Sequence, residues 1–163
     1  MPLTNIPTAD QIPYPDPALN LQPVKIINAW ATSSTENSQG VNVILDAENI
    51  KWTSKGRGQS IFMDIGTEQI TIKRMLIEWD PALARTGHFE IEFILSPATP
   101  EGDPEVKDKT FDGQQDTSLF TLLEDPDGAK ARAIRIRCFG NDGYNADDNN
   151  GISNVKLWSA SVQ

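Results

Sequence analysis

The fold is decided by two stretches of the chain, Lys51-Trp-Thr-Ser-Lys-Gly-Arg-Gly-Gln-Ser-Ile-Phe-Met-Asp-Ile-Gly66 and Ala131-Arg-Ala-Ile-Arg-Ile-Arg-Cys-Phe-Gly-Asn141. The first predicts a turn at a tryptophan, a polar glycine-rich loop, and a strand that closes on Asp-Ile-Gly. The second alternates apolar and charged residues, which is the period of a half-buried strand. It ends in a Gly-Asn loop that leads to a last strand over 152–158. Both stretches therefore predict strands joined by polar loops.

The rest of the chain from residue 24 onward shows the same strand pattern. Every second residue between 88 and 95 is apolar, which predicts a core face made of Phe89, Ile91, Phe93 and Leu95. The intervening Glu90 and Glu92 are expected to face solvent, as are Arg135 and Arg137. In 70–79 the apolar set changes parity near Lys73-Arg74, which indicates a bulge or two consecutive strands.

Turn signals divide these strands from one another. Proline, glycine, aspartate and asparagine cluster at 100–104, 112–113, 125–128 and 141–143. Further strands are expected over 41–45, 60–65 and 117–123, and no segment keeps a helical period. Short strands separated by such turns predict an all-β protein, a β-sandwich.

Composition restricts the class of protein and of partner. A chain of 163 residues is long enough for one domain with a full core and too short for two ordinary ones. The formal net charge of -9 argues against nucleic acid and against anionic membranes as partners. The single cysteine, Cys138, excludes an internal disulfide, and its place on an apolar strand face predicts that it is buried.

The first 23 residues form a separate segment in this interpretation. They hold about half of the 11 prolines, and proline cannot occupy an interior strand or a helix interior. We expect 1–23 to be an arm or linker and 24–163 to be a single domain. The start of the chain lacks the basic and apolar regions of a secretion signal. Two localisations stay open: cytoplasmic if Met1 is the native start, extracellular if the chain is a piece of a secreted enzyme.

Little in the sequence favours catalysis. His88 is the one histidine, so a multi-histidine zinc site is excluded and any catalytic triad would have to use this residue. No Gly-Lys-Ser/Thr phosphate loop occurs. A catalytic carboxylate pair of the glycosidase type is the less favoured interpretation of the acidic residues, because acids on exposed strand faces usually only interact with solvent. We therefore expect a protein that is not an enzyme.

The motifs resemble those of a known family over roughly residues 30–160. Ala31-Thr-Ser-Ser-Thr35, the segment from Asp46 to Trp52, and Gly140-Asn141 resemble the discoidin-like (coagulation-factor C-type) modules of the galactose-binding fold. The closest likeness is to carbohydrate-binding members appended to polysaccharide lyases and glycosidases. This resemblance implies a jelly-roll β-sandwich that binds oligo- or polysaccharide without altering it. Such a module would be a small lectin or would accompany a catalytic module in a longer chain. The alternative is a structural, assembly or protein-binding discoidin-like domain.

The resemblance also implies where a sugar would bind. The loops around 54–58, 80–88 and 141–149 would form the site at one end of the sandwich. Guanidinium, amide and carboxylate groups can grip adjacent hydroxyls, and an aromatic face packs on the C–H side of a pyranose. The expected ligand-binding residues are Arg57, Trp79, Asp80, Arg85, His88, Asn141, Tyr144 and Asn145.

A structural calcium ion is the last implication of the resemblance. The family begins such a site at an aspartate, here Asp46, and completes it with backbone carbonyls, a threonine and a late glutamate. In this chain Ile50 stands near the threonine position and Asn154 replaces the glutamate. Asp46, Glu48 and Asn154 are the candidate calcium ligands, since all three offer oxygen.

Overall fold

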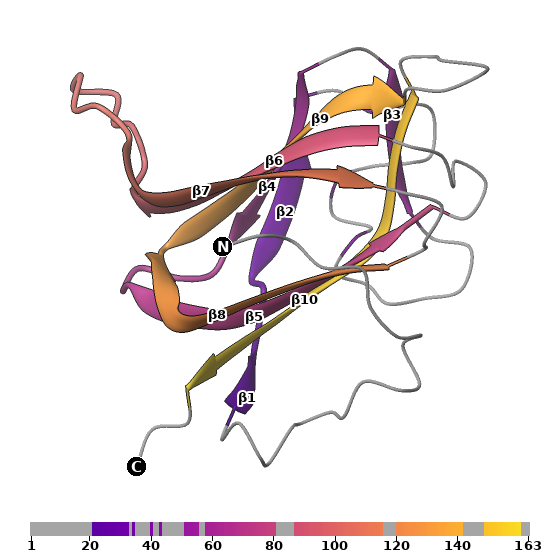
Figure 1. Cartoon of the computed structure of the whole chain (residues 1–163). Helices are drawn as coiled ribbons and strands as arrows, with labels where there is room; N and C mark the ends of the chain where they lie inside the picture. The colour runs from indigo at the N-terminus through magenta and orange to yellow at the C-terminus, as the bar shows by residue number, and fades with distance from the viewer. Residues whose placement is uncertain are drawn as a thin grey trace.

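A computed structural model describes residues 21–32, 34, 40, 43, 51–55, 58–80, 87–115, 120–141 and 149–160. These residues form two antiparallel sheets that face each other as two layers (Figure 1). Sheet A has the order β1 (Leu21–Val24), β10 (Asn149–Ala160), β5 (Ile70–Trp79) and β8 (Phe120–Ala131), and β3 (Trp52–Lys55) also pairs with β10. Sheet B has the order β2 (Asn28–Ala31), β4 (Gln59–Asp64), β9 (Ala133–Asn141), β6 (Gly87–Ser96) and β7 (Val106–Gln115). The predicted β-sandwich is confirmed.

The core between the sheets consists of the inward residues of both layers. The predicted members Phe89, Ile91, Phe93, Ile134, Ile136 and Cys138 are all buried in it. Burial raises the pKa of the Cys138 thiol to about 12, so this residue acts as a small apolar side chain. Among the described residues, no helix is long and apolar enough to cross a membrane.

The prediction that Leu95 lies in the core is wrong. Leu95 is partly exposed, and its neighbour Ile94 is buried instead. The pairing of β6 with β7 shifts register between Phe93 and Ile94 and again between Ile94 and Ser96. A shift of one residue turns side chains to the other face, so the alternation that holds up to Phe93 does not continue.

The sequence prediction missed strand β7, and the turn expected at Asp112-Gly113 is wrong. Both residues lie within β7, where Gly113 pairs with Phe89. Strand β7 is an edge strand of sheet B, and most of its side chains are charged or polar. Charged side chains are common on edges because they discourage pairing with other chains, and they hide the strand pattern.

The edge strand β1 contains part of the segment expected to be an arm. Pro23 pairs with Trp158 at the edge of sheet A, a place that proline tolerates because one side of the strand needs no partner. Residues 1–20 lie outside the described residues. The division into an arm over 1–23 and a domain over 24–163 thus stays a prediction, and its boundary runs through β1.

The change of parity near Lys73-Arg74 is confirmed as a bulge. Ile72 pairs with Ala129 and Arg74 pairs with Glu124, so the four residues 125–128 of β8 lie opposite Lys73 alone. The turn residues expected at 125–128 therefore bulge out of one continuous strand. Lys73 Nζ donates to the Pro126 carbonyl at 3.0 Å across the bulge. Gly128 has φ +79°, and a Cβ there would collide with Thr71 Cγ2.

We expect Gly128→Ala to destabilise the protein more than Gly102→Ala. Gly102, in the turn between β6 and β7, also has a positive φ (+99°), but a Cβ there meets nothing within 4 Å. Backbone strain of about 1–3 kcal/mol applies to both changes, and the collision with Thr71 adds to it only at Gly128. Urea unfolding measures both free energies. Equal losses would contradict the collision.

Candidate functional site

Several strands begin or end at the same end of the sandwich, at the right of Figure 1. Lys55, the last residue of β3, pairs with Asn149, the first residue of β10. Trp79, the last residue of β5, pairs with Ile152 of the same strand. In sheet B, Asn141 at the end of β9 pairs with Gly87 at the start of β6. The connections that start after Lys55, Trp79 and Asn141 therefore leave from one end, which we call the loop end.

Four of the predicted ligand-binding residues lie outside the described residues: Arg57, Arg85, Tyr144 and Asn145. Asn141 is the last residue of β9, and the structure describes its backbone but not its side chain. What the structure describes is the position of the strand ends that flank these residues. The role of these five in binding stays a prediction.

Trp79, which the sequence predicted to contact a ligand, is buried in the structure. Its side chain is 3% exposed and belongs to the core cluster. The ring packs at a tilt against Phe89 with centroids 4.9 Å apart, and Nε1 donates to Thr121 Oγ1 at 2.8 Å. Buried tryptophans usually satisfy their N–H in this way. Both the ring face and the donor are thus used inside the protein.

Asp80, also a predicted ligand-binding residue, is buried and paired. It is 2% exposed, and both of its carboxylate oxygens lie 3.0 Å from Lys51 Nζ. Its amide N–H donates to the Gly151 carbonyl at 3.1 Å, which ties the end of β5 to β10. A buried carboxylate needs such a partner because leaving it unpaired costs several kcal/mol. Asp80 fixes the start of the following loop.

His88 lies at the start of β6 and is exposed. It is one residue from Phe89, which faces the core, so strand alternation places it on the same face as Glu90. This is the outer face of sheet B, next to the loop end. Of the predicted ligand-binding residues whose side chains are described, His88 is the exposed one.

Asn154 is the one predicted metal ligand that the structure describes. It is buried, and its Nδ2 donates to the Val43 carbonyl at 2.8 Å. Its Oδ1 is buried and has no hydrogen-bond partner among the described residues. Asp46 and Glu48 lie outside the described residues. Elsewhere in the described chain no three His, Cys, Asp or Glu residues gather as a metal site.

A buried ion cluster on the outer face of sheet B corrects the expectation of solvent exposure for Glu92 and Arg135, which are buried, whereas Glu90 and Arg137 are partly exposed. Glu92 is 0% exposed and receives two bonds from Arg135, at 2.9 and 2.6 Å. Lys107 and Arg137 also form ion pairs with Glu92, and Glu105 binds the same Arg135 guanidinium. Burial raises the pKa of Glu92, but the bonds from Arg135 and Lys107 outweigh it and lower that pKa to about 2.

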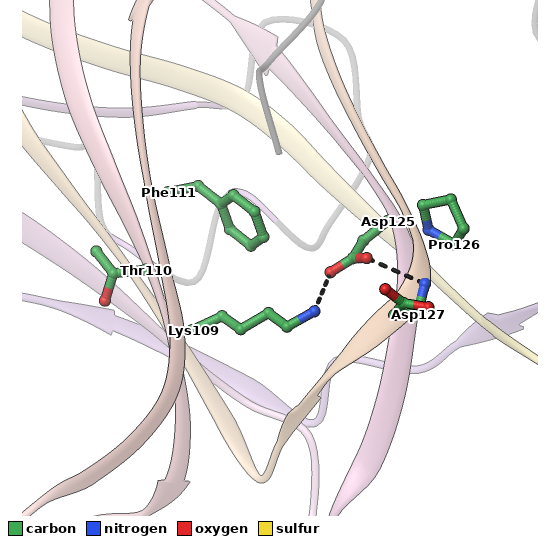
Figure 2. A pocket seen from close by; sticks show the side chains of 6 residues that line it. All are labelled: Lys109, Thr110, Phe111, Asp125, Pro126 and Asp127. Atoms are coloured by element: carbon green, nitrogen blue, oxygen red, sulfur yellow. Dashed lines mark hydrogen bonds and ion pairs between the residues drawn. The ribbon is translucent and has the colours of Figure 1, made fainter.

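A polar pocket of about 520 Å³ lies between the two edge strands β7 and β8 (Figure 2). Lys109 Nζ donates to Asp125 Oδ2 at 2.8 Å, and the Asp127 amide donates to the other carboxylate oxygen at 3.1 Å. The hydrogen bond to Asp125 raises the pKa of Lys109. The bulge that forms this pocket lies opposite Lys73, far along β5 from Trp79. The pocket is therefore separate from the loop end, and its cation is already paired.

Comparison with solved structures identifies the fold. The family 32 carbohydrate-binding module of AlyQ, in complex with 4,5-unsaturated mannuronic acid, gives a TM-score of 0.65 at 24% identity and covers 83% of this chain and 97% of that module. A truncated AlyQ with the module and alginate lyase domains gives 0.67 at 22% identity and covers 88% of this chain and 34% of that chain. The family 32 module of NanJ from C. perfringens, in complex with galactose, gives 0.60 at 17% identity and covers 81% of this chain and 93% of the other.

These likenesses establish a shared fold, the galactose-binding-like β-sandwich of family 32 carbohydrate-binding modules. The resemblance drawn from the sequence motifs is confirmed at this level. No family model and no curated protein matches the chain.

We expect the ion cluster to make stability depend on pH in the acid range. Because folding lowers the pKa of Glu92 from 4.5 to about 2, its contribution is present above pH 4.5 and is lost as the pH falls toward 2. Glu92→Gln should lose about 3–5 kcal/mol at neutral pH and show a shallower pH dependence below 4.5. Thermal melts at several pH values measure this. Glu101→Gln, at an exposed turn, is the control for charge, and an unchanged pH slope in Glu92→Gln would contradict the assignment.

Proposed function

We propose that this chain is a non-catalytic carbohydrate-binding module that recognises oligo- or polysaccharide at the loop end. The observation that supports this most is the shared fold with one module that was solved in complex with 4,5-unsaturated mannuronic acid and another that was solved in complex with galactose. The convergence of the described strand ends on one end provides the place where loops can surround a ligand. AlyQ, which joins such a module to alginate lyase domains, supports a role beside a catalytic module.

The residues proposed to bind the sugar differ from the set that was expected from the sequence. With Trp79 and Asp80 assigned to the framework, the charged candidates are Arg57, Arg85 and His88. A guanidinium fork can donate two hydrogen bonds to vicinal hydroxyls or to a uronate carboxylate. Asn141 and Asn145 would add amide groups, and Tyr144 is the remaining aromatic candidate for the C–H face of the ring.

We propose also that calcium stabilises the module near Asn154. The unpartnered, buried Oδ1 of Asn154 supports this proposal, because a hard cation prefers oxygen ligands and would satisfy that atom. Asp46 and Glu48 would supply carboxylates. The ion would hold the chain around residues 43–48 against β10 and would have no part in contacting the sugar.

A structural or protein-binding module without affinity for sugars is the competing proposal. Both functions are compatible with this fold, so only binding experiments distinguish between them. A symmetric oligomer with no response to any saccharide would favour the competing proposal.

We expect Arg85→Ala to weaken saccharide binding by about ten-fold or more. A hydrogen bond to a charged group contributes about 1.5–3 kcal/mol, and 1.4 kcal/mol corresponds to a factor of ten in affinity. Calorimetry against the best ligand from a glycan array measures the change. Lys25→Ala is the matched control, since Lys25 is an exposed cation in the connection between β1 and β2. Equal affinity of Arg85→Ala and the parent would move the site away from this loop.

We expect millimolar calcium to raise the melting temperature and a chelator to lower it. Binding to the native state alone stabilises it by mass action, by about 2.7 kcal/mol at 100 times the dissociation constant. Asn154→Ala should lose the calcium-dependent shift, whatever its own melting temperature. Magnesium at equal concentration is the control for ionic strength. A shift that survives in Asn154→Ala, or no shift in the parent, would remove calcium from this site.

A further inference from the structure

A row of four side chains crosses the outer face of sheet B. Trp30 on β2 pairs with Phe62 on β4, Phe62 pairs with Arg135 on β9, and Arg135 pairs with Glu92 on β6. Residues that are paired across adjacent strands point to the same face. The four side chains therefore lie side by side, from the β2 edge toward the middle of the sheet.

The members of this row are in contact. The Trp30 and Phe62 rings stack with centroids 5.7 Å apart and an interplanar angle of 11°. The Arg135 guanidinium lies over the Phe62 ring, 5.3 Å from its centroid, and is held by its two bonds to Glu92. The buried ion cluster thus anchors Phe62, and Phe62 supports the Trp30 ring. A ring held in place in this way loses little side-chain entropy when it binds.

Trp30 is exposed even though it is supported. Its exposed fraction is 47%, whereas Trp52, Trp79 and Trp158 are exposed by 3% or less. One face of the Trp30 ring is used by Phe62. The other face of this pre-positioned ring offers apolar area that a ligand can cover.

Polar groups flank the ring along the strands. Two residues from Trp30, just beyond the end of β2, the exposed Thr32 donates to Gln59 Oε1 at 2.8 Å and accepts from the Ser60 amide at 2.9 Å. Two residues back, the exposed Asn28 pairs with Asp64. Side chains two residues apart on a strand are about 6.8 Å apart, a spacing that places hydroxyl, amide and carboxylate groups on both sides of the ring.

The charges beside the stack compensate one another. Three acids, Glu90, Glu92 and Glu105, form ion pairs with three bases: Lys107, Arg135 and Arg137. A charged polymer would have to break these pairs to find a partner. A ligand rich in hydroxyls and without charge matches the surface, because it needs only the ring face and neutral or already paired polar groups.

We propose that the outer face of sheet B around Trp30 is a second binding site, for a neutral polysaccharide chain. The pyranose C–H face would pack on the open face of Trp30, and the sugar hydroxyls would bond to Thr32 and Asn28. The site lies on the side of the sandwich, and its Thr32 end borders the loop end at the start of β4. It adds a second contact along the same polymer, so the two sites together would retain the polymer through avidity.

The test is affinity electrophoresis in gels that contain galactomannan, xyloglucan or amylose, with alginate as the charged comparison. Trp30→Ala should lose at least three-quarters of the retardation in the neutral polymer that binds best, and Trp30→Tyr should keep most of it. Val106→Ala is the matched control, since Val106 is 46% exposed on the opposite edge strand of the same sheet. Melting of each variant checks the fold.

Arg85→Ala separates this site from the loop end. If retardation by neutral polymer falls in Trp30→Ala and persists in Arg85→Ala, the second site stands even if the loop-end proposal fails. If Arg85→Ala abolishes the retardation by neutral polymer and Trp30→Ala leaves that retardation unchanged, the second site is refuted and the proposed function stands. No retardation of the parent by any of the three neutral polymers also refutes the second site.

Fluorescence gives an independent measurement. Acrylamide should quench one exposed tryptophan in the parent, and the bound neutral polymer should reduce that quenching at least two-fold.

Sedimentation tests whether the Trp30 surface binds a second copy of the chain instead. Concentration-dependent dimers that disappear in Trp30→Ala, without any effect of polymer on quenching, would assign the Trp30 surface to self-association and overturn the proposal.

Discussion

The rest of the structure depends on the pairing of β10 with three other strands. One side of β10 pairs with β5 along most of its length, while the other side pairs with β3 at residues 149–152 and with β1 at residues 157–160. The short interval between those two partners contains Asn154, whose side chain reaches the Val43 carbonyl. Strand β10 therefore sets the loop end through its first residues, and it sets the place proposed for calcium through its middle.

The two faces of sheet B have different physical roles. The inner face is apolar and packs on sheet A. The outer face contains a buried ion cluster, in which a fully buried carboxylate accepts bonds from Arg135 and Lys107. Charges removed from water stabilise a fold only when each has good partners, and here a fork-like guanidinium supplies two parallel bonds. The same cluster positions Phe62 and, through it, the exposed ring of Trp30. A feature that secures the sheet thus also prepares a surface for binding.

The two proposed binding regions differ in how their side chains are positioned, since one consists of loops and the other is part of a sheet. Asp80 ties the end of β5 to Gly151 of β10, so the loops that follow start from fixed points. Loops on a rigid scaffold can change their side chains without disturbing the fold. The Trp30 surface is instead part of a sheet, where strand spacing places the polar groups. A module with both would hold a polymer at one end and along one side.

The alternation of apolar residues by itself determined the sandwich and the core faces of β6 up to Phe93 and of β9, because a strand with one buried face must place every second residue inside. It also predicted the bulge at Lys73-Arg74. It failed at Leu95, where register shifts reverse the faces, and at β7, where a charged edge strand has no apolar pattern to detect. The predicted strands over 117–123 and 152–158 overlap β8 and β10, whose observed bounds differ by several residues. The motifs assigned Trp79 and Asp80 to the ligand, since sequence does not reveal whether an aromatic or acidic residue finds a partner inside the protein.

Only the tertiary structure decided the pairing of Glu92 with Arg135 and the exposure of Trp30. Those residues are 43 and more positions apart in the chain, and their meeting depends on which strands are neighbours in sheet B. Local sequence specifies the face of a strand, whereas strand order specifies the contacts across it. The burial of charge and the row from Trp30 to Glu92 follow from strand order, so they appear only when the fold is complete.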